Sequence, residues 1–264
     1  MGNSSADPDI LQTVAKRSPL LERLEDGPAA KPELIEVLDC SRSTINRAIR
    51  ELEGLDCIRR TDDGFQLTVA GRLALSEHRR SLRTFESVSQ LSDLLRDLPA
   101  ETPIAVEMVR GATLLETPPH APSEPLEEII DLIGRADRIR GMAAADRMPK
   151  FRQQFYDGSV NGDLDVELLL TEDLARFTLT EYTQRLRELI VDGGVDLYAV
   201  ETVPYELSIV ETPTKSVVYV ILLNSDLTHR GVIRNDSADA IEWAHGLFRR
   251  HRASATSLSP FDDR

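Results

Sequence analysis

The feature that most constrains this chain is the segment 40–52, CSRSTINRAIREL, in which apolar residues recur at helical spacing. The spacing is i, i+3, i+4, i+7, which predicts a helix with one buried face. Ser41 is a favourable N-cap residue, so we expect the helix to span 41–53. The residues of the apolar stripe are Ile45, Ala48, Ile49 and Leu52.

The opposite face of this predicted helix carries hydrogen-bonding side chains and no acidic one. Most are short or planar, and such side chains reach base edges and phosphates in a major groove. We therefore predict that this face contacts double-stranded DNA; the alternative is an ordinary amphipathic helix with a solvated basic face. The predicted contact residues are Arg42, Ser43, Thr44, Asn46, Arg47 and Arg50.

Two short apolar-striped segments, Pro19–Asp26 and Pro32–Leu38, precede the helix, and Asp39–Ser41 forms a tight turn. This order predicts a helix-turn-helix. Downstream, alternating apolar residues surround the sequence TDDG, and Asp-Gly between two such runs indicates a hairpin. We expect this hairpin, 58–69, to be the wing of a winged helix, with Arg59 and Arg60 near the backbone of a bound duplex.

The net charge of −14 is unusual for a DNA-binding protein, but it is unevenly distributed. Residues 40–75 hold six basic against five acidic residues, so the basic groups concentrate where DNA is expected. The whole chain has only four lysines, at 16, 31, 150 and 215. An acidic composition poor in lysine suggests a proteome adapted to high salt; the alternative is a generic acidic cytosolic protein.

Residues 70–98 have helical periodicity without a clean heptad, which predicts a connector that also helps two subunits pair. The alternative is a helix that packs on its own domain. We expect a winged helix-turn-helix domain over 8–72, a connector and dimerisation helix over 73–98, an effector domain over 99–252 and a flexible tail over 253–264.

Beyond Pro99 the pattern alternates between strands and helices, which predicts an α/β (α+β) fold. We expect strands at Ile104–Val109 and Asp165–Thr171, and a long helix over Glu172–Val191. Several strands cluster near the end of the chain, so part of the sheet should be antiparallel. The predicted fold is therefore an N-terminal winged helix joined by a helix to a mixed-sheet α/β effector domain.

Three segments, Asp137–Leu174, Val195–Asn224 and His229–Arg252, resemble a known family; the last contains GVIRND before a helix with EWA. Over residues 10–252 the chain is similar to archaeal regulators that join a winged helix to a methanogenesis-regulator (FilR-type) domain. The resemblance implies a transcription regulator, with many relatives in haloarchaea. It also implies an effector domain distantly similar to phospholipase D and sugar-sensing TrmB-type folds.

The sequence does not predict an enzyme. None of the five histidines is followed two residues later by Lys, as phospholipase D chemistry requires, and GxSxG, Walker, GxGxxG and HExxH motifs do not occur. Cys40 and Cys57 form no CxxC pair, so we expect no metal and no cofactor. No apolar run approaches the length that spans a membrane, so we expect a cytoplasmic protein.

A small-molecule effector site is the remaining expectation for the second domain. Ligands of open α/β sheets bind beyond the carboxyl ends of the strands. The alternative for each residue at these ends is a capping, surface or core role. The candidate ligand-binding residues are Arg110, Asp146, Phe151, Tyr156 and Tyr205.

Together these patterns predict a dimeric, DNA-binding transcription regulator that reads a near-palindromic site and responds to an effector through its second domain. One alternative is an adaptor whose winged helix binds a protein of the transcription machinery, which the net acidity favours. Another is a metabolite-binding protein with secondary DNA binding.

Overall fold

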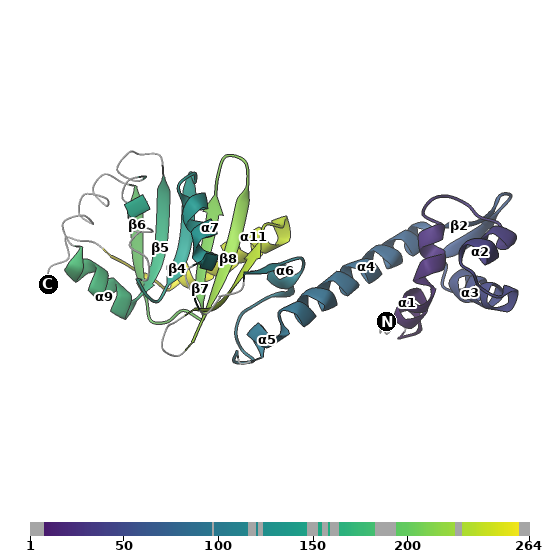
Figure 1. Ribbon diagram of the computed structural model, residues 1–264, viewed down its shortest axis with the longest axis horizontal. Coiled ribbons are helices and arrows are strands. Elements are labelled where there is room, and N and C mark those ends of the chain that lie inside the picture. The colour runs from purple at the N-terminus through teal and green to yellow at the C-terminus, as the bar shows by residue number, and fades with distance from the viewer. Residues whose placement is uncertain are drawn as a thin grey trace, which may run out of the picture. The chain divides into compact units, whose positions relative to one another are not determined.

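The computed structural model describes residues 8–96, 98–115, 120, 124–146, 153–154, 158, 164–182, 194–224 and 229–258. The chain divides into two compact units, Met1–Phe85 and Glu86–Arg264 (Figure 1). The fold class agrees with the sequence prediction, because a winged helix-turn-helix is followed by a mixed α/β sheet. Within the described ranges, every helix is too short or too polar to cross a bilayer.

Three helices form the body of the first unit: α1 (Pro8–Arg23), α2 (Lys31–Val37) and α3 (Arg42–Gly54). The prediction for the first helix was too short, since α1 begins at Pro8 and contains Pro19. Its earlier turns belong to the helix because Val14 extends the buried stripe of Leu21 toward the N-terminus. The helices enclose one apolar core together with the wing.

The wing consists of β1 (Ile58–Thr61) and β2 (Gly64–Leu67), paired antiparallel across a two-residue turn. Ala29, just before α2, pairs with Phe65 through two backbone hydrogen bonds of 3.0 and 2.9 Å. Gly64 has φ +122°, and a Cβ there would lie 2.3 Å from the Ala29 carbonyl oxygen. Glycine at 64 therefore allows the segment before α2 to approach the wing.

Helix α4 (Val69–Gln90) begins directly after the wing. The Gly71 N–H donates to the Thr68 hydroxyl at 2.9 Å, and a Cβ at Gly71 would lie 2.0 Å from the Cys57 carbonyl oxygen. The prediction of one helix over 70–98 was wrong, because the helix ends before Leu91 and α5 (Ser92–Leu95) follows. At Leu91 (φ −90°, ψ 0°) the chain turns, and Leu91 is buried in the core of the second unit.

The second unit contains an eight-stranded sheet in the order β10-β6-β5-β4-β7-β8-β9-β3. The central strands β4, β5 and β6 are parallel, whereas the pairs from β4–β7 through β3–β9 are antiparallel, as the sequence predicted. The strands are β3 (Thr113–Leu115), β4 (Arg138–Ala143), β5 (Asp165–Thr171), β6 (Val195–Val200), β7 (Glu206–Glu211), β8 (Ser216–Leu223), β9 (His229–Asn235) and β10 (Thr256–Ser257).

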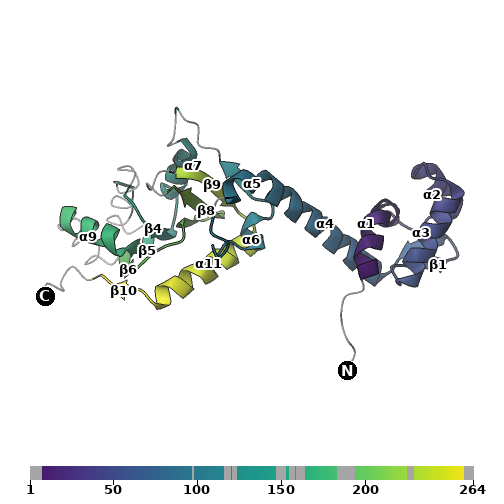
Figure 2. The ribbon, with the colours of Figure 1, turned by 90° about the horizontal axis from the view of Figure 1, so that it is seen from below.

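Helices cover both faces of this sheet (Figure 2). On one face, α7 (Glu124–Ile133) and α9 (Glu172–Glu181) pack against the strands. On the other lie α6 (Val106–Val109) and α11 (Ala238–Ala253). Two cores therefore sandwich the sheet, and β8 is buried at six of its eight positions.

The expectation of a strand over Ile104–Val109 was wrong. Residues 106–109 form α6, where Met108 and Val109 are buried beside α11. A short apolar run does not distinguish a strand from a buried helical turn, and here packing against α11 selects the helix. The nearby strand that the sequence did not predict is β3, which pairs with β9 at the edge of the sheet.

Residues 253–258 also depart from expectation, since a flexible tail was predicted over 253–264; residues 259–264 lie outside the described residues. Instead Ala253 ends α11, and β10 pairs antiparallel with β6. Leu258 donates its N–H to the Leu197 carbonyl at 2.9 Å and packs against the sheet core. The open edge of β6 supplies the unpaired backbone groups that order this segment.

Candidate nucleic-acid interface

The position of α3 follows from its cap and its apolar stripe. The Ser41 hydroxyl accepts a hydrogen bond from the Thr44 N–H at 3.2 Å, which confirms the predicted N-cap. Burial of the apolar side turns the opposite side outward. The buried residues are those predicted, Ile45, Ala48, Ile49 and Leu52.

The structure brings all six predicted contact residues of α3 onto its outer face, where five are exposed and Asn46 is half-buried. Arg47 is 70% exposed, and its guanidinium lies 3.8 Å from the Glu51 carboxylate. The same carboxylate accepts a 2.8 Å hydrogen bond from buried Arg17 of α1, which lowers the pKa of Glu51. Glu51 is therefore ionised and bound mainly by Arg17, which leaves Arg47 available to a ligand.

One basic residue beside this face was missed by the sequence reasoning. The Lys31 ammonium lies 3.0 Å from the Asn46 Oδ1 and 5.6 Å from the centroid of the Phe65 ring. Lys31 is the first residue of α2, fifteen positions before Asn46, so no local pattern joined the two. A signal was present, because Lys31 is the single basic residue in the segment 24–41, which leads into α3.

The wing presents Arg59 and Arg60, both exposed, on β1. Arg59 donates to the Gln66 side chain directly across the hairpin, at 3.4 Å. The tip of the wing holds two exposed carboxylates, Asp62 and Asp63. Because carboxylates repel phosphates, strand β1 with its two arginines, and not the tip, is suited to approach a nucleic acid backbone.

A family model for the middle domain of the methanogenesis regulatory protein FilR1 matches residues 122–254, about half of the chain. The chain belongs to the FilR1 middle-domain family. A second model, the HVO_A0261 N-terminal domain, matches residues 5–90 and so includes the winged helix. No curated protein matches the chain.

Two solved structures are similar to the chain only at a low level. TrmBL2, described as an archaeal chromatin protein with a novel mode of DNA binding, is 11% identical, with 96% of this chain and 100% of that chain covered and a TM-score of 0.42. The dimethyltransferase RosA from Streptomyces davawensis is 19% identical, with 72% and 62% covered and a TM-score of 0.24. Both scores are too low to support a conclusion.

The candidate ligand residues that the structure describes, Arg110, Asp146 and Tyr205, each contact a different partner. Tyr205 is 1% exposed in the core beneath α11, and its hydroxyl donates to the Pro103 carbonyl at 2.7 Å. Burial raises the pKa of the Tyr205 phenol, which places this residue in a core role. Asp146 accepts from the Tyr182 hydroxyl at 3.4 Å, and Arg110 pairs with Asp239 at 3.5 Å. Phe151 and Tyr156 lie outside the described residues.

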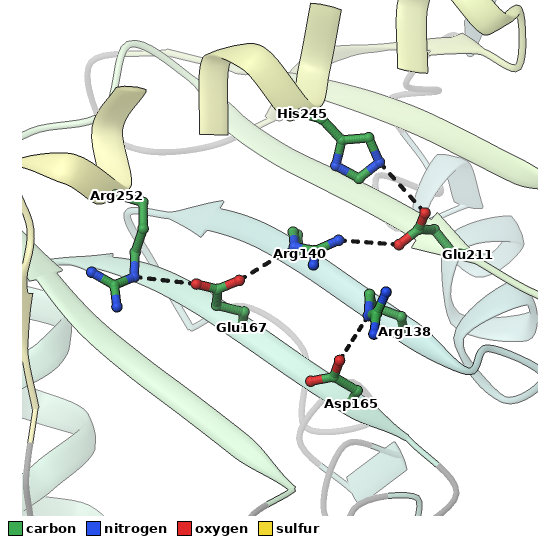
Figure 3. A network of polar contacts seen from close by, with 7 residues as sticks. All are labelled: Arg138, Arg140, Asp165, Glu167, Glu211, His245 and Arg252. Carbon is green, nitrogen blue, oxygen red and sulfur yellow. Dashed lines mark hydrogen bonds and ion pairs between the residues drawn. The ribbon is translucent and has the colours of Figure 1, made fainter. Parts of the chain in front are cut away.

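Among the described residues of the FilR1 middle domain, a polar cluster lies between three strands and α11 (Figure 3). Arg140 on β4 contacts Glu167 on β5 and Glu211 on β7, both at 3.2 Å. From α11, Arg252 contacts Glu167 at 3.2 Å and His245 lies 3.4 Å from Glu211. Arg140 and Glu167 lie in the amino-terminal halves of β4 and β5, away from the carboxyl ends where ligands of α/β sheets bind. The cluster therefore fastens α11 to the sheet.

The side chain of Asn235, the last residue of β9, connects this strand to the residues around α6 and to the start of α11. It is 2% exposed, and its Nδ2 donates to the carbonyls of Met108 and Arg110 at 2.9 and 3.0 Å. Its Oδ1 accepts from the Ser237 N–H that begins α11. Gly111, next to Arg110, in turn donates its N–H to the Ser87 hydroxyl near the end of α4, at 3.0 Å.

Proposed function

We propose that this protein is a sequence-specific, DNA-binding transcription regulator that acts in the cytoplasm. The observation that carries the proposal is the outer face of α3 between Arg42 and Arg50, where five hydrogen-bonding residues are exposed and none is acidic, beside a wing with two exposed arginines. Membership of a family named for a regulatory protein supports it. The proposal gives the second unit a regulatory rather than a catalytic role.

In this proposal the two parts of the interface have different tasks. Asn46, Arg47 and the first turn of α3 enter the major groove and read base edges, as recognition helices do. Arg59 and Arg60 neutralise phosphates and fix the register of the domain on the duplex. Affinity depends on few charges, so it should arise from close hydrogen bonds rather than from long-range attraction at high salt.

The proposal is tested by selecting preferred duplexes from a random pool and measuring affinity by fluorescence anisotropy. Arg47→Ala should weaken binding to the selected duplex by ~1–3 kcal/mol and relax preference at one position. Arg176→Ala is the matched control, because Arg176 is a 73% exposed arginine on α9. Equal losses on selected and scrambled duplexes would remove base reading from Arg47.

The second test is genome-wide chromatin immunoprecipitation at the native salt of the host. Sharp peaks that share a short sequence, absent for a variant without Arg42, Arg47 and Arg50, are the expected result. Peaks that survive this triple substitution would favour an adaptor that reaches promoters through a protein partner. The acidic wing tip, Asp62 and Asp63, is the feature that such an adaptor would use.

The proposal includes a homodimer on a near-palindromic site. Helix α4 supports it, because Leu82, Phe85 and Val88 are 48%, 70% and 42% exposed at i, i+3 and i+6. Large apolar side chains on one side of a helix favour burial against a second copy. Phe85→Glu should convert dimers to monomers in multi-angle light scattering. Phe177→Glu, at a 46% exposed phenylalanine of α9, is the control.

We also propose that the second unit modulates DNA binding, with a small-molecule effector as the signal. The chain of hydrogen bonds from Asn235 through the α6 segment to Ser87 supports this, since it links the start of α11 to the end of α4. Energetic coupling between two sites is reciprocal. If the state of the second unit changes the affinity for DNA, then DNA binding must change the state of the second unit. Addition of the selected duplex should therefore change hydrogen exchange in residues 86–111, whereas a scrambled duplex should not.

A further inference from the structure

We infer that Lys31 is a positioning residue that fixes the side-chain amide of Asn46 as a hydrogen-bond donor toward DNA. The inference rests on the proposed function, and it adds a specificity determinant outside the recognition helix. Lys31 lies at the start of α2, with its ammonium 3.0 Å from the Asn46 Oδ1.

The main chain beside Lys31 is held by the wing, which places the base of the lysine side chain near α3. Ala29, two residues earlier, is held to Phe65 of the wing by paired N–H···O bonds of 3.0 and 2.9 Å. The ammonium then stands 5.6 Å from the centroid of the Phe65 ring, a distance at which a cation and an aromatic face attract. The wing, the start of α2 and the outer face of α3 therefore converge on Lys31.

The chemistry of the pair decides which way the Asn46 amide faces. An asparagine amide carries an acceptor at one end and two donors at the other, and rotation about χ2 exchanges them at low cost. A lysine ammonium has only donors, so it can pair with the oxygen and not with the nitrogen. Lys31 thus selects the orientation in which Oδ1 faces α2 and Nδ2 faces away from Lys31.

The selected orientation has a consequence for base recognition. Among the described residues, the Asn46 Nδ2 has no hydrogen-bond partner, while the Asn46 carbonyl accepts from Arg50 Nε at 3.3 Å. A free NH₂ group in the major groove pairs with acceptors such as the purine N7. The charged partner on Oδ1 also strengthens this donor. An amide that only donates suits guanine, which offers O6 and N7, better than adenine, whose N6 amino group would need the occupied Oδ1, and Lys31 should set the size of this preference.

The test compares Lys31→Met with the wild-type chain on the selected duplex and on every single-base-pair variant of it. Methionine keeps the apolar stem and removes the ammonium. We expect discrimination at the base pair read by Asn46 to fall about tenfold, with other positions unchanged. The double variant K31M/N46A should discriminate no worse than N46A, because the two residues act through one amide.

Three controls separate this role from others. Lys16→Met removes the same charge from exposed Lys16 on α1 and should leave discrimination unchanged. Lys31→Arg keeps a charged donor and should restore most of the discrimination. Thermal unfolding of K31M should match the wild type, since Lys31 is exposed.

Two results would overturn the inference. If K31M weakens all duplexes equally, lowers the salt slope by about 1 and adds to N46A, then Lys31 is a phosphate contact. If K31R is as impaired as K31M, then the ammonium does not act by orienting the amide. A wild-type chain that selects no sequence would instead overturn the proposed function itself, before any variant is made.

Discussion

Three arginines of the proposed DNA-binding surface and three of the second unit lie in contrasting surroundings. In the first unit Arg42, Arg59 and Arg60 are exposed, and none has a carboxylate partner among the described residues. The three arginines of the second unit have the opposite surroundings. Arg140, Arg234 and Arg252 each contact at least one carboxylate, and their side chains are 25%, 19% and 35% exposed; Arg252 also stacks 3.2 Å from the Tyr198 ring centroid.

The contrast shows that the surroundings, and not the residue type, determine what a guanidinium does. An exposed arginine without a carboxylate keeps its full charge for an external anion, but contributes little to stability. A half-buried arginine between carboxylates holds layers together, and it cannot be removed without leaving an uncompensated charge. Substitutions in the two units should therefore separate DNA affinity from the free energy of unfolding.

The largest effect is expected for Arg140→Met, which removes the residue between Glu167 and Glu211. Breaking a fully buried pair costs about 3–5 kcal/mol, and we expect about 2–3 kcal/mol because a quarter of each side chain is exposed. Urea denaturation measures the loss. DNA affinity of the folded protein should be unchanged. A loss of stability as small as that of an exposed arginine would break the comparison between the units.

The double substitution R59Q/R60Q should have the reverse signature. Loss of two phosphate contacts should reduce the slope of log affinity against log salt by about 2, equally for selected and scrambled duplexes. Stability should change by no more than about 0.5 kcal/mol, since both side chains are exposed. Anisotropy titrations over a range of KCl concentrations provide the measurement, and an unchanged slope would show that the wing does not contact phosphate.

A smaller effect is expected for His245, a residue of α11 whose imidazole lies beside Glu211. Desolvation lowers the pKa of His245 below its usual 6.5, and the Arg140 charge adds to this against the pull of Glu211. The folded state then binds fewer protons than the unfolded state, so stability is present above pH 6.5 and declines as pH falls below it.

We expect this decline to begin as the pH falls from 6.5 towards 5. Its measure is the difference in unfolding free energy between the wild type and His245→Gln over a pH series. A difference that grows in favour of the wild type in acid would mean that the ion pair with Glu211 dominates.

The smallest effect is expected for Arg138→Gln. Arg138 lies two residues before Arg140 on β4 and contacts Asp165 at 2.7 Å. The side chains of Arg138 and Asp165 are 49% and 55% exposed. Exposed pairs contribute about 0–1 kcal/mol, so we expect a loss below about 0.5 kcal/mol in the urea experiment used for Arg140. A loss equal to that of Arg140→Met would show that pair geometry outweighs burial in this cluster.

The recognition helix and the wing could be predicted because their signals are local. The stripe from Ile45 to Leu52 lies within two turns, the Ser41 cap binds three residues ahead, and the hairpin turn joins adjacent strands. The strand Asp165–Thr171 was equally clear, since a continuous apolar run suits a strand buried on both faces.

The remaining features depend on contacts between distant residues. Lys31 reaches Asn46 only because Ala29 pairs with the wing, and Arg140 meets a glutamate 71 positions away. Tyr205 was predicted to bind a ligand because it follows a strand, but the direction of its side chain depends on the packing of α11. Sequence periodicity predicts which face of a helix or strand is buried, but not which distant residues that face contacts.

The antiparallel half of the sheet also sets an order of events during folding. β7 and β8 are adjacent in the sequence and are closed by the Thr212–Lys215 turn, so their pairing requires little loop closure. β4 precedes them in the chain but pairs with β7, and its parallel partner β5 is reached only through a crossover. The β7–β8 hairpin should therefore gain protection from exchange first. During synthesis, β4 remains unpaired with β7 until the ribosome has released residues beyond 211.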